Sequence, residues 1–521
     1  MTRKPAAALV LLLALSGCTG DSDTPGGKVF QDPGVPTGAL RLVAFDTCDD
    51  LLVGLRGAAK AAVGPWGFNN GGREMAAGGA VPDGARAAAP GGGTEDKAAS
   101  AGSTSTYSKT NAHEAGADEP DLVKTDGRRI VTVAGGVVRV IDVASRRTSG
   151  SLDLAANLSG GRRPDAAPEV EAKLRAGFTN LLLAGDHVLL LGNGNFGYDL
   201  PATDSGGPGG VPGPDGKPIL GTTVTLVDIA GPPKVVSSYT VDGGVLDARQ
   251  IGSTARLVVR SAPRLSFDLN KSNPAERDQL AANKKVIDRA PLSDWLPRYS
   301  ITDSAGKRTS GQVDCRSVHR PAEYSATALL TVLTFDLNRS TLDTGDPVSV
   351  VADGDTVYAN GPSLYVANDK RWHTARLQIA DGDPTAQPVV RATELYRFAI
   401  SGAGKPRFAG GGKVDGWLLT QYSLSEWDGH LRVATTTDTQ PGVARGAKSE
   451  SAVHVLRADG TKLVEVGKVG GLGKGERIYS VRFVGPTGYV VTFRQTDPLY
   501  TLNLRDPKAP RVLGELKITG Y

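Results

Sequence analysis

Five polar side chains lie close together between residues 113 and 121: His113, Glu114, Asp118, Glu119 and Asp121. Carboxylates are preferred ligands of Ca²⁺, so one interpretation of this acidic cluster is a hard-cation site. The spacing matches no calcium-binding loop, however, and acidic residues ahead of a strand are commonly solvated or paired with a neighbouring structural unit. We favour this second interpretation and predict no metal site and no cofactor.

A second stretch, Gly192-Asn193-Gly194-Asn195-Phe196-Gly197, has the glycine spacing of a dinucleotide-binding loop. Such a loop needs a helix directly after it, because the helix N-terminus binds the pyrophosphate. Pro201 and a Gly/Pro-rich stretch follow instead, which predicts a long hairpin loop. The six histidines lack the paired spacing of zinc ligands. The chain also has no G-x-S-x-G nucleophile motif.

Aromatic residues offer another kind of binding chemistry. Trp372-His373, Trp417, Tyr422 and Trp427 are suited to stacking on a sugar or a peptide. The alternative is packing between sheets, which large side chains commonly fill. We favour packing.

These residues belong to a repeated pattern of short apolar runs that are rich in Val and Ile, which favours strands. The unit that defines the pattern covers residues 118–143, where Asp126-Gly127 and Gly135-Gly136 supply tight turns between strands, and the sixth copy, from Arg477, is the clearest. In the fifth copy, Trp417–Leu424 is the predicted first strand and Asp428-Gly429 the first turn. The six copies begin near residues 121, 181, 245, 356, 417 and 477.

Repeated units of about four strands predict an all-β fold, a β-propeller with about six visible blades. The alternative is a β-sandwich or a pair of them. Helical spacing of apolar residues also predicts a short N-terminal helix after Thr47. A second helix inside an insertion is predicted to start at Asn273-Pro274 and to continue over Glu276–Arg289.

The first residues predict export. Arg3 and Lys4 precede an apolar run over Ala6–Leu15, and Leu15-Ser16-Gly17-Cys18 resembles a bacterial lipobox. This implies cleavage before Cys18 and a diacylglyceryl group on its sulfur, with palmitate-type lipid holding the chain to the outer face of the cell membrane. The alternatives are an ordinary secretory signal or a small anchoring helix.

Two cysteines remain after Cys18, namely Cys48 and Cys315. In an oxidising compartment two such residues are a natural disulfide pair. This bond would connect the N-terminal segment to the middle of the propeller. Two free buried thiols are the alternative.

The predicted organisation has five parts. They are a signal peptide (1–17), a flexible tether (18–39), a short strand and an amphipathic helix that docks on the propeller (40–66), a disordered Gly/Ala-rich linker (67–106), and the propeller (107–521) with insertions near 160–178 and 268–324.

Several sequence segments resemble those of a known family. Asn111–Asp121 followed by Leu122–Gly127, and Glu476–Phe483 with Tyr489–Arg494 and Asp497–Tyr500, resemble secreted bacterial lipoproteins with a C-terminal β-propeller distantly related to WD-40 repeats. The resemblance covers about Tyr107 to the end, plus the helix at Cys48. It implies a propeller outside the cytoplasmic membrane and brings no established activity, so no catalytic residue can be carried over. Similar proteins usually continue further, with seven or eight blades expected in a complete ring. The alternatives for this chain are a C-terminal truncation or a ring that closes with fewer blades.

Composition and motifs lead to two functional hypotheses. A net charge of +4 without long basic runs does not indicate nucleic acid. The first hypothesis is a lipid-anchored binding or scaffold module for a protein, peptide or cell-wall ligand. The alternative is an exported enzyme, a quinone- or metal-dependent dehydrogenase or a lyase, with its site at the ring centre. The candidate ligand-facing residues on the first strands are Asp247, Arg249, Gln421, Arg477 and Arg482.

Overall fold

A computed structural model of the chain describes residues 42–44, 47–68, 112–154, 178–192, 211–219, 221–268, 275–321, 327–368, 392–437, 449–493 and 497–518. The predicted signal peptide, Cys18 and the tether lie outside these residues, as do the aromatic pair at 372–373, the glycine motif beyond Gly192 and nearly all of the predicted linker and first insertion. None of the helices in the described ranges has the length and apolar character needed to span a membrane.

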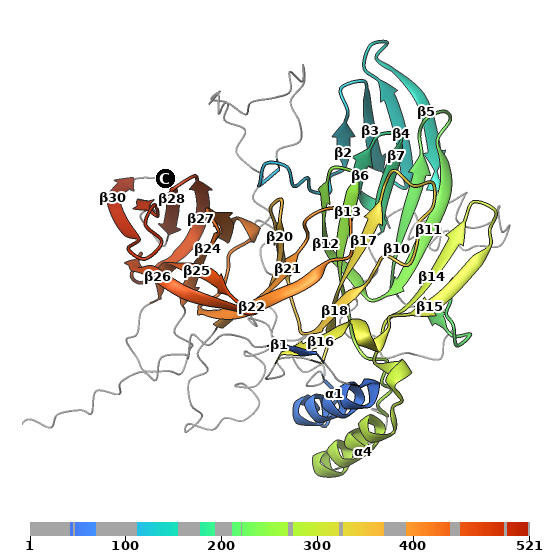
Figure 1. Cartoon of the computed structure of the whole chain (residues 1–521), viewed down its shortest axis with the longest axis horizontal. Helices are drawn as coiled ribbons and strands as arrows, with labels where there is room; N and C mark the ends of the chain where they lie inside the picture. Colours follow the sequence, from blue (N-terminus) through green and yellow to red (C-terminus); the bar gives the residue numbers. More distant parts are fainter. Residues whose placement is uncertain are drawn as a thin grey trace, which may run out of the picture. The chain divides into compact units, whose positions relative to one another are not determined.

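In the described residues, six units of four antiparallel strands follow one another, some of them joined or extended into larger sheets, and we number them blades I to VI (Figure 1). Blade I contains β2 (Val123–Thr125), β3 (Arg129–Ala134), β4 (Val137–Asp142) and β5 (Arg147–Asp153). Blade II contains β6 (Phe178–Ala184), β7 (His187–Gly192), β10 (Gly221–Asp228) and β11 (Lys234–Asp242), with a small hairpin of β8 (Val211–Pro212) and β9 (Pro218–Ile219) before β10. Blade III contains β12 (Gly244–Ile251), β13 (Thr254–Ser261), β17 (Leu329–Asp336) and β18 (Val348–Val351).

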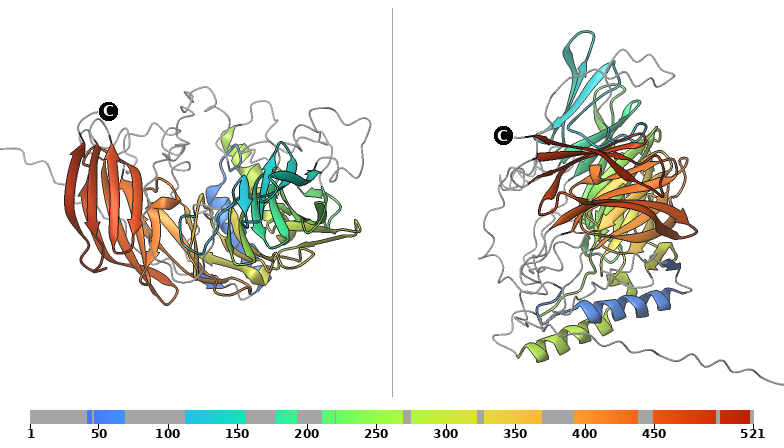
Figure 2. Two further views of the ribbon diagram at one scale, coloured as in Figure 1. Left: turned by 90° about the horizontal axis from the view of Figure 1, so that it is seen from above. Right: turned by 90° about the vertical axis from the view of Figure 1, so that its left-hand side faces the viewer.

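The second half of the chain repeats this order. Blade IV contains β19 (Thr356–Ala359), β20 (Ser363–Asn368), β21 (Ala392–Ala399) and β22 (Arg407–Asp415). Blade V contains β23 (Leu424–Trp427), β24 (His430–Thr437), β25 (Glu450–Asp459) and β26 (Lys462–Leu472). Blade VI contains β27 (Arg477–Val484), β28 (Thr487–Phe493), β29 (Asp497–Asn503) and β30 (Arg511–Ile518), seen as red strands in both views of Figure 2. The all-β propeller-like architecture predicted from the repeats is therefore confirmed.

The predicted turn chemistry connects these strands. Asp428 and Gly429 both have positive φ (49° and 71°) between β23 and β24, and Gly135 and Gly136 do the same between β3 and β4. Two consecutive positive φ angles fit the right-handed twist of the flanking strands, which is why Asp-Gly and Gly-Gly occur here.

Two strand assignments differ from the sequence pattern. Trp417–Leu424 is not a strand: Trp417 makes an isolated bridge to Thr436, residues Gln421–Ser423 form the 3₁₀ turn η4, and β23 begins only at Leu424. The Thr420 hydroxyl accepts from the Tyr422 amide (3.3 Å), a local bond that competes with the strand ladder. The strand β5 was not predicted. Its side chains are mostly exposed, so its sequence has no apolar pattern that would mark a strand.

Each blade packs on the next through a buried apolar cluster. Between blades I and II, Val131 and Val138 pack with Leu181 and Leu190, and all four are fully buried. Equivalent clusters join the later pairs of blades around Leu226 and Leu257, Val332 and Val366, Tyr365 and Leu431, and Val453 and Val490. Burial between consecutive sheets therefore holds the blades in series.

Two helices lie side by side next to blade III (Figures 1 and 2): α1 (Cys48–Ala62) and α4 (Glu276–Arg289). Thr47 caps α1 by accepting from the Asp50 amide (3.1 Å), as its position predicts. The apolar stripe of α1, with Leu51, Leu55 and Ala59, is buried in a cluster that includes residues of the insertion and of blade III. This stripe explains why a single N-terminal helix folds here.

Short strands extend two of the sheets. β14 (Arg298–Asp303) and β15 (Arg308–Gln312) continue blade II beyond β11. β16 (Val318–Pro321) pairs with β18 of blade III, and β1 (Leu42–Ala44) pairs with β16. The insertion and the N-terminal segment are thus built onto the outer edges of blades II and III.

Candidate functional site

Residues 112–122, which we call the crossing segment, connect the first strands of several blades. Asp118 exchanges backbone hydrogen bonds with Gln250 of blade III, both 2.8 Å long. Asp121 does the same with Leu181 of blade II (3.2 and 2.8 Å). The segment that contains the acidic cluster therefore joins blades that come later in the chain.

Glu114 connects the crossing segment to blades IV and V. Its carboxylate accepts from the Tyr358 hydroxyl (2.8 Å) and from the Ser425 hydroxyl (3.1 Å). Burial raises the pKa of Tyr358, and the adjacent Glu114 carboxylate adds to this shift. The hydroxyl thus stays protonated and donates to Glu114 across the neutral range.

His113 lies beside this contact. Its Nε2 is 3.0 Å from the Leu424 carbonyl, and its ring makes edge contacts with Tyr358 and Tyr422. The imidazole side chain is 5% exposed. The histidine of the acidic cluster is therefore packed between aromatic rings.

The other carboxylates of the cluster are bonded separately. Asp118 accepts from Lys124 (2.8 Å), whose side chain is 2% exposed, and Glu119 accepts from Gln421 (3.1 Å). Within the described ranges, no three His, Cys, Asp or Glu side chains are gathered in a way that could hold a metal ion. The geometry corresponds to acidic residues that pair with neighbouring blades.

The structure brings together three of the five candidate residues from the first strands. Arg249, which is 2% exposed, forms an ion pair with Asp247 (2.7 Å) and donates to the Gln421 side chain. Its Nη2 also donates to the Val357 carbonyl of blade IV (2.6 Å). Because Gln421 in turn donates to Glu119, a continuous polar network runs from blade III to the crossing segment.

The other two candidates lie elsewhere. Arg477 and Arg482 are exposed on β27 of blade VI. In the strand register Arg477 lies opposite Phe493 and Arg482 opposite Tyr489. Ile478, Val481 and Phe483 of β27 are buried against blade V, with a bulge between the first two, and the exposed arginines are on the opposite face of the sheet.

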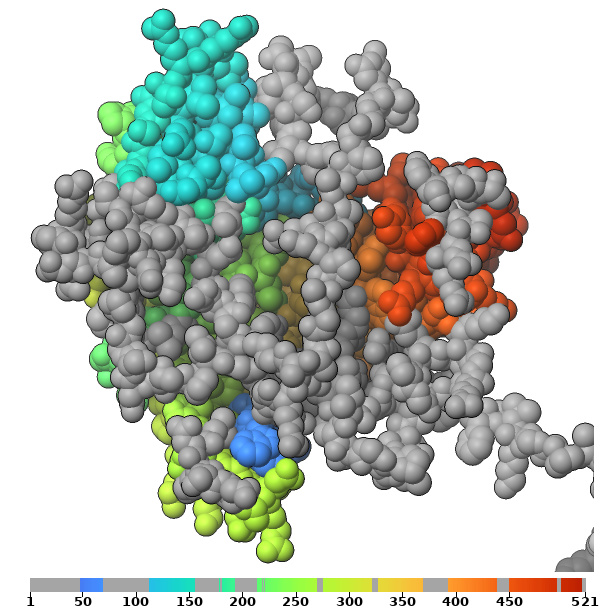
Figure 3. Space-filling model, turned by 180° about the vertical axis from the view of Figure 1, so that it is seen from behind, coloured from blue at the N-terminus to red at the C-terminus, as the bar shows by residue number. Residues whose placement is uncertain are grey.

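This outward surface, which we call the blade VI face, is apolar and aromatic as well as cationic. Tyr479 is 67% exposed and its ring is 5.8 Å from that of Phe493, which is 44% exposed. Val484 and Leu516 are 57% and 59% exposed. The strands of blade VI reach the molecular surface in Figure 3, where they are red. The described residues of the blade VI face are Arg477, Tyr479, Arg482, Val484, Tyr489, Phe493, Arg511 and Leu516.

Of the remaining aromatic candidates, two are packed against other side chains and one is exposed. Trp417 is 6% exposed and Trp427 lies under the Arg432 guanidinium (5.9 Å to the ring centroid). Tyr422 is 39% exposed and lies 4.7 Å from the His113 ring. Packing thus accounts for the two tryptophans, while Tyr422 borders the crossing segment.

The structure also contains a hydrogen-bonded group of three residues that resembles a catalytic triad and that the sequence did not predict. Thr435 Oγ1 is 3.1 Å from His454 Nε2, and His454 Nδ1 is 2.7 Å from a Glu465 oxygen. Burial alone would raise the pKa of Glu465, but the hydrogen bond and charge of His454 outweigh it and lower that pKa. The connectivity is that of a hydrolase triad, yet His454 and Thr435 are buried in adjacent strands. The three residues therefore brace the sheet of blade V in this structure, and no sequence motif marks them.

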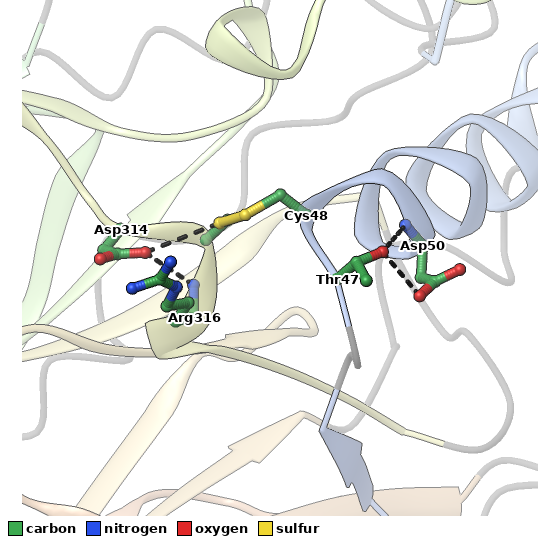
Figure 4. The surroundings of a disulfide bond; sticks show 6 residues. Thr47, Cys48, Asp50, Asp314 and Arg316 are labelled. Carbon is green, nitrogen blue, oxygen red and sulfur yellow. Dashed lines mark hydrogen bonds between the residues drawn. A yellow bond between two sulfur atoms is a disulfide. The ribbon is translucent and has the colours of Figure 1, made fainter.

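The disulfide candidates are also adjacent (Figure 4). Cys48 and Cys315 are joined through their sulfurs, with Cα atoms 5.6 Å apart. Cys48 is the first residue of α1, and Cys315 begins the 3₁₀ turn η3 (Cys315–Ser317), whose Asp314 accepts from the Arg316 amide (2.9 Å). The lipidation candidate Cys18 lies outside the described residues.

Comparison with curated proteins gives two archaeal relatives. An uncharacterized protein of Methanocaldococcus jannaschii is 50% identical over 111 residues, which are 21% of this chain and 17% of that protein. An uncharacterized protein of Archaeoglobus fulgidus is 47% identical over 132 residues, 25% of this chain and 19% of that protein. The matched regions are thus less than a fifth of the length of either relative.

Solved structures resemble the chain only loosely. An apocarotenoid oxygenase of Synechocystis, as a Glu-to-Gln mutant, covers 76% of this chain and 71% of its own, with 10% identity and a TM-score of 0.28. Drosophila Plexin A in complex with Semaphorin 1b covers 77% and 79%, with 8% identity and a TM-score of 0.28. Similarities this low support no inference about activity.

A family model described as a beta propeller domain matches residues 107–521, which include all six blades and the crossing segment. The match covers most of the chain and agrees with the blade architecture. The chain therefore belongs to the beta propeller domain family.

Proposed function

We propose that this chain is a lipid-anchored, extracytoplasmic binding or scaffold module whose blade VI face docks a protein partner. The observation that carries this proposal is the exposure of aromatic and aliphatic side chains together on one sheet face, with Tyr479 at 67% and Leu516 at 59%. A sheet face with contiguous exposed apolar surface is normally covered by a neighbouring blade or by a partner, and we propose a partner.

The charged residues of the blade VI face indicate what kind of partner surface would fit it. Arg482 and Arg511 are exposed on the blade VI face, and Arg477 is exposed beside Phe493. Arginine and tyrosine are the residues that most often dominate binding energy at interfaces. We therefore infer a partner surface that is apolar and acidic, because complementary charge favours association and selects against other partners.

The proposed anchor rests on the lipobox at Leu15–Cys18. A Cys18→Ala variant should lose the site of lipid attachment, and the chain should move from the membrane fraction to the soluble fraction. Fractionation of cells followed by immunoblotting measures this. Retention of the cleaved variant on membranes would contradict the anchor.

The partner-binding proposal is tested by crosslinking in native cells and mass spectrometry. A Tyr479→Ala, Arg482→Glu double variant should reduce capture of a specific partner by at least about tenfold, because it removes an exposed aromatic anchor and reverses a charge. Both residues are exposed, so the fold should be retained.

Arg457→Glu is the matched control, because Arg457 is exposed on β25 of blade V and undergoes the same change of charge. Capture that falls equally in the control and the double variant would contradict a specific role of the blade VI face. Capture of a wall polymer instead of a protein would redirect the proposal to that ligand class.

One observation supports the alternative of an exported enzyme with a central site. Asp247, Arg249 and Gln421 converge with Glu119 next to the crossing segment. A quinone or metal ion that copurifies with the chain, and is lost in an Arg249→Met variant that still folds, would favour the enzyme.

A further inference from the structure

Three arginines reach across blade boundaries in the same way. Arg129 (blade I), Arg256 (blade III) and Arg432 (blade V) lie on the second strand of their blades. Their guanidinium groups donate to backbone carbonyls in the next blade: to Gly185 and Ile229 of blade II (2.9 and 3.2 Å), to Gly402 of blade IV (2.5 Å) and to Gly485 of blade VI.

The charge of two of these arginines is balanced by the protein itself. Arg129 forms ion pairs with Asp126 (2.8 Å) and Asp186 (2.9 Å). Arg432 has no carboxylate partner among the described residues, but it donates to the Ser425 hydroxyl (2.7 Å) and lies 4.8 Å from the centroid of the Phe483 ring. An aromatic face stabilises a buried cation through its quadrupole.

Among the described residues, Arg256 has neither a carboxylate partner nor an aromatic ring beside it. Its side chain is 1% exposed, and Nε and Nη1 have no hydrogen-bond partner within the described part of the chain. Burial lowers its pKa to about 10, so it remains a cation at neutral pH. A buried guanidinium without a counter-charge is strongly unfavourable, which is why such groups are normally paired.

A second unsatisfied donor lies beside it. Thr334 on β17 is the register partner of Arg256 on β13, and its hydroxyl is also buried without a partner in the described ranges. Directly paired residues on neighbouring strands have Cβ atoms about 5 Å apart and share one face. Arg249 occupies the same row on β12, but Asp247 already balances its charge.

Neighbouring buried side chains limit the size of any ligand that binds between Arg256 and Thr334. Two residues further along each strand, Val258 and Val332 are on the same face and fully buried. The other end lies near the surface, because Gly402, whose carbonyl accepts from Arg256, is exposed. A small ligand could exchange there, whereas an extended one would have to displace the core.

We propose that Arg256 and Thr334 bind a small inorganic anion, of the size of a halide, at the junction of blades III and IV. The anion stabilises the Arg256 cation, as the carboxylates of Asp126 and Asp186 stabilise Arg129 and the face of the Phe483 ring stabilises Arg432. It joins the two sheets and is not the ligand of the blade VI face.

Thermal unfolding in sodium chloride or bromide, compared with sodium gluconate at the same ionic strength, tests this proposal. The wild-type chain should show a Tm that rises and saturates with halide concentration, by about 2–4 °C. An Arg256→Met variant should lose this dependence. Arg432→Met is the matched control and should keep it, because Arg432 binds protein groups only.

Crystals of the wild-type chain in bromide provide a second measurement, which remains decisive if Arg256→Met fails to fold. An anomalous peak within hydrogen-bonding distance of Arg256 and Thr334 is the expected result. Ordered water alone at these atoms, or a halide effect on Tm that is equal in wild type and Arg256→Met, would overturn the proposal.

Discussion

An Asp242→Ala substitution is expected to lower the free energy of unfolding by about 3 to 5 kcal/mol, the usual cost of breaking a buried ion pair. Asp242 is 4% exposed and ends β11 of blade II. It accepts from the amide and Nε of Arg298 (both 2.9 Å), from Arg298 Nη2 (3.1 Å) and from Arg264 Nη1 (2.8 Å).

The loss is large because two cations would remain. The Arg298 side chain is 4% exposed, and although burial alone would lower its pKa, Asp242 and Asp215 outweigh this and raise it. Asp215 forms a second ion pair with Arg298 (2.7 Å), but its side chain is 42% exposed, so it compensates only in part. The pairing also holds the β14–β15 hairpin on blade II.

Chemical denaturation of the wild type and the variant measures this effect. Asp288→Ala is the control, because Asp288 forms an exposed ion pair with Lys60 (2.8 Å, side chains 52% and 41% exposed). Exposed pairs contribute at most about 1 kcal/mol. An Asp242→Ala loss no larger than the control would show that the buried network is not stabilising. Asp242→Asn separates loss of charge from loss of hydrogen bonds.

A Cys48→Ser substitution is expected to lower the free energy of unfolding by about 2–4 kcal/mol under oxidising conditions. The two cysteines are 267 residues apart. A crosslink that closes so long a loop restricts the unfolded chain strongly, which favours the folded state. The bond also fixes the N-terminal end of α1 to the insertion, where Leu51 and Leu55 are buried.

Cys315→Ser should have the same effect, and the double variant should cost no more than either single one, because both remove the same bond. Non-reducing peptide mapping of the protein purified from its native cells should recover the linked peptides. Two alkylatable thiols, or additive losses in the double variant, would contradict the disulfide.

Several features were predictable because they depend on neighbouring residues. The Asp428-Gly429 turn, the Thr47 cap and the C-terminal end of α4 at Arg289 follow from local backbone preferences and apolar spacing. The first strand of blade V was placed too early, because residues 421–423 form the turn η4, at which the Thr420 hydroxyl accepts from the Tyr422 amide. The exposed strand β5 carried no apolar pattern to detect.

The repeated strands, the turn residues and the polar side chains near the start of each blade could be predicted from local sequence patterns. Which of those side chains meet depends on how the blades pack. Arg249 contacts Gln421 across 172 residues, while Arg482 lies on a different surface. Likewise, the sequence of a strand does not show which of its two faces another sheet will cover. Blade V covers Ile478 and Phe483 but leaves Tyr479 exposed, because burial depends on the packing of whole sheets.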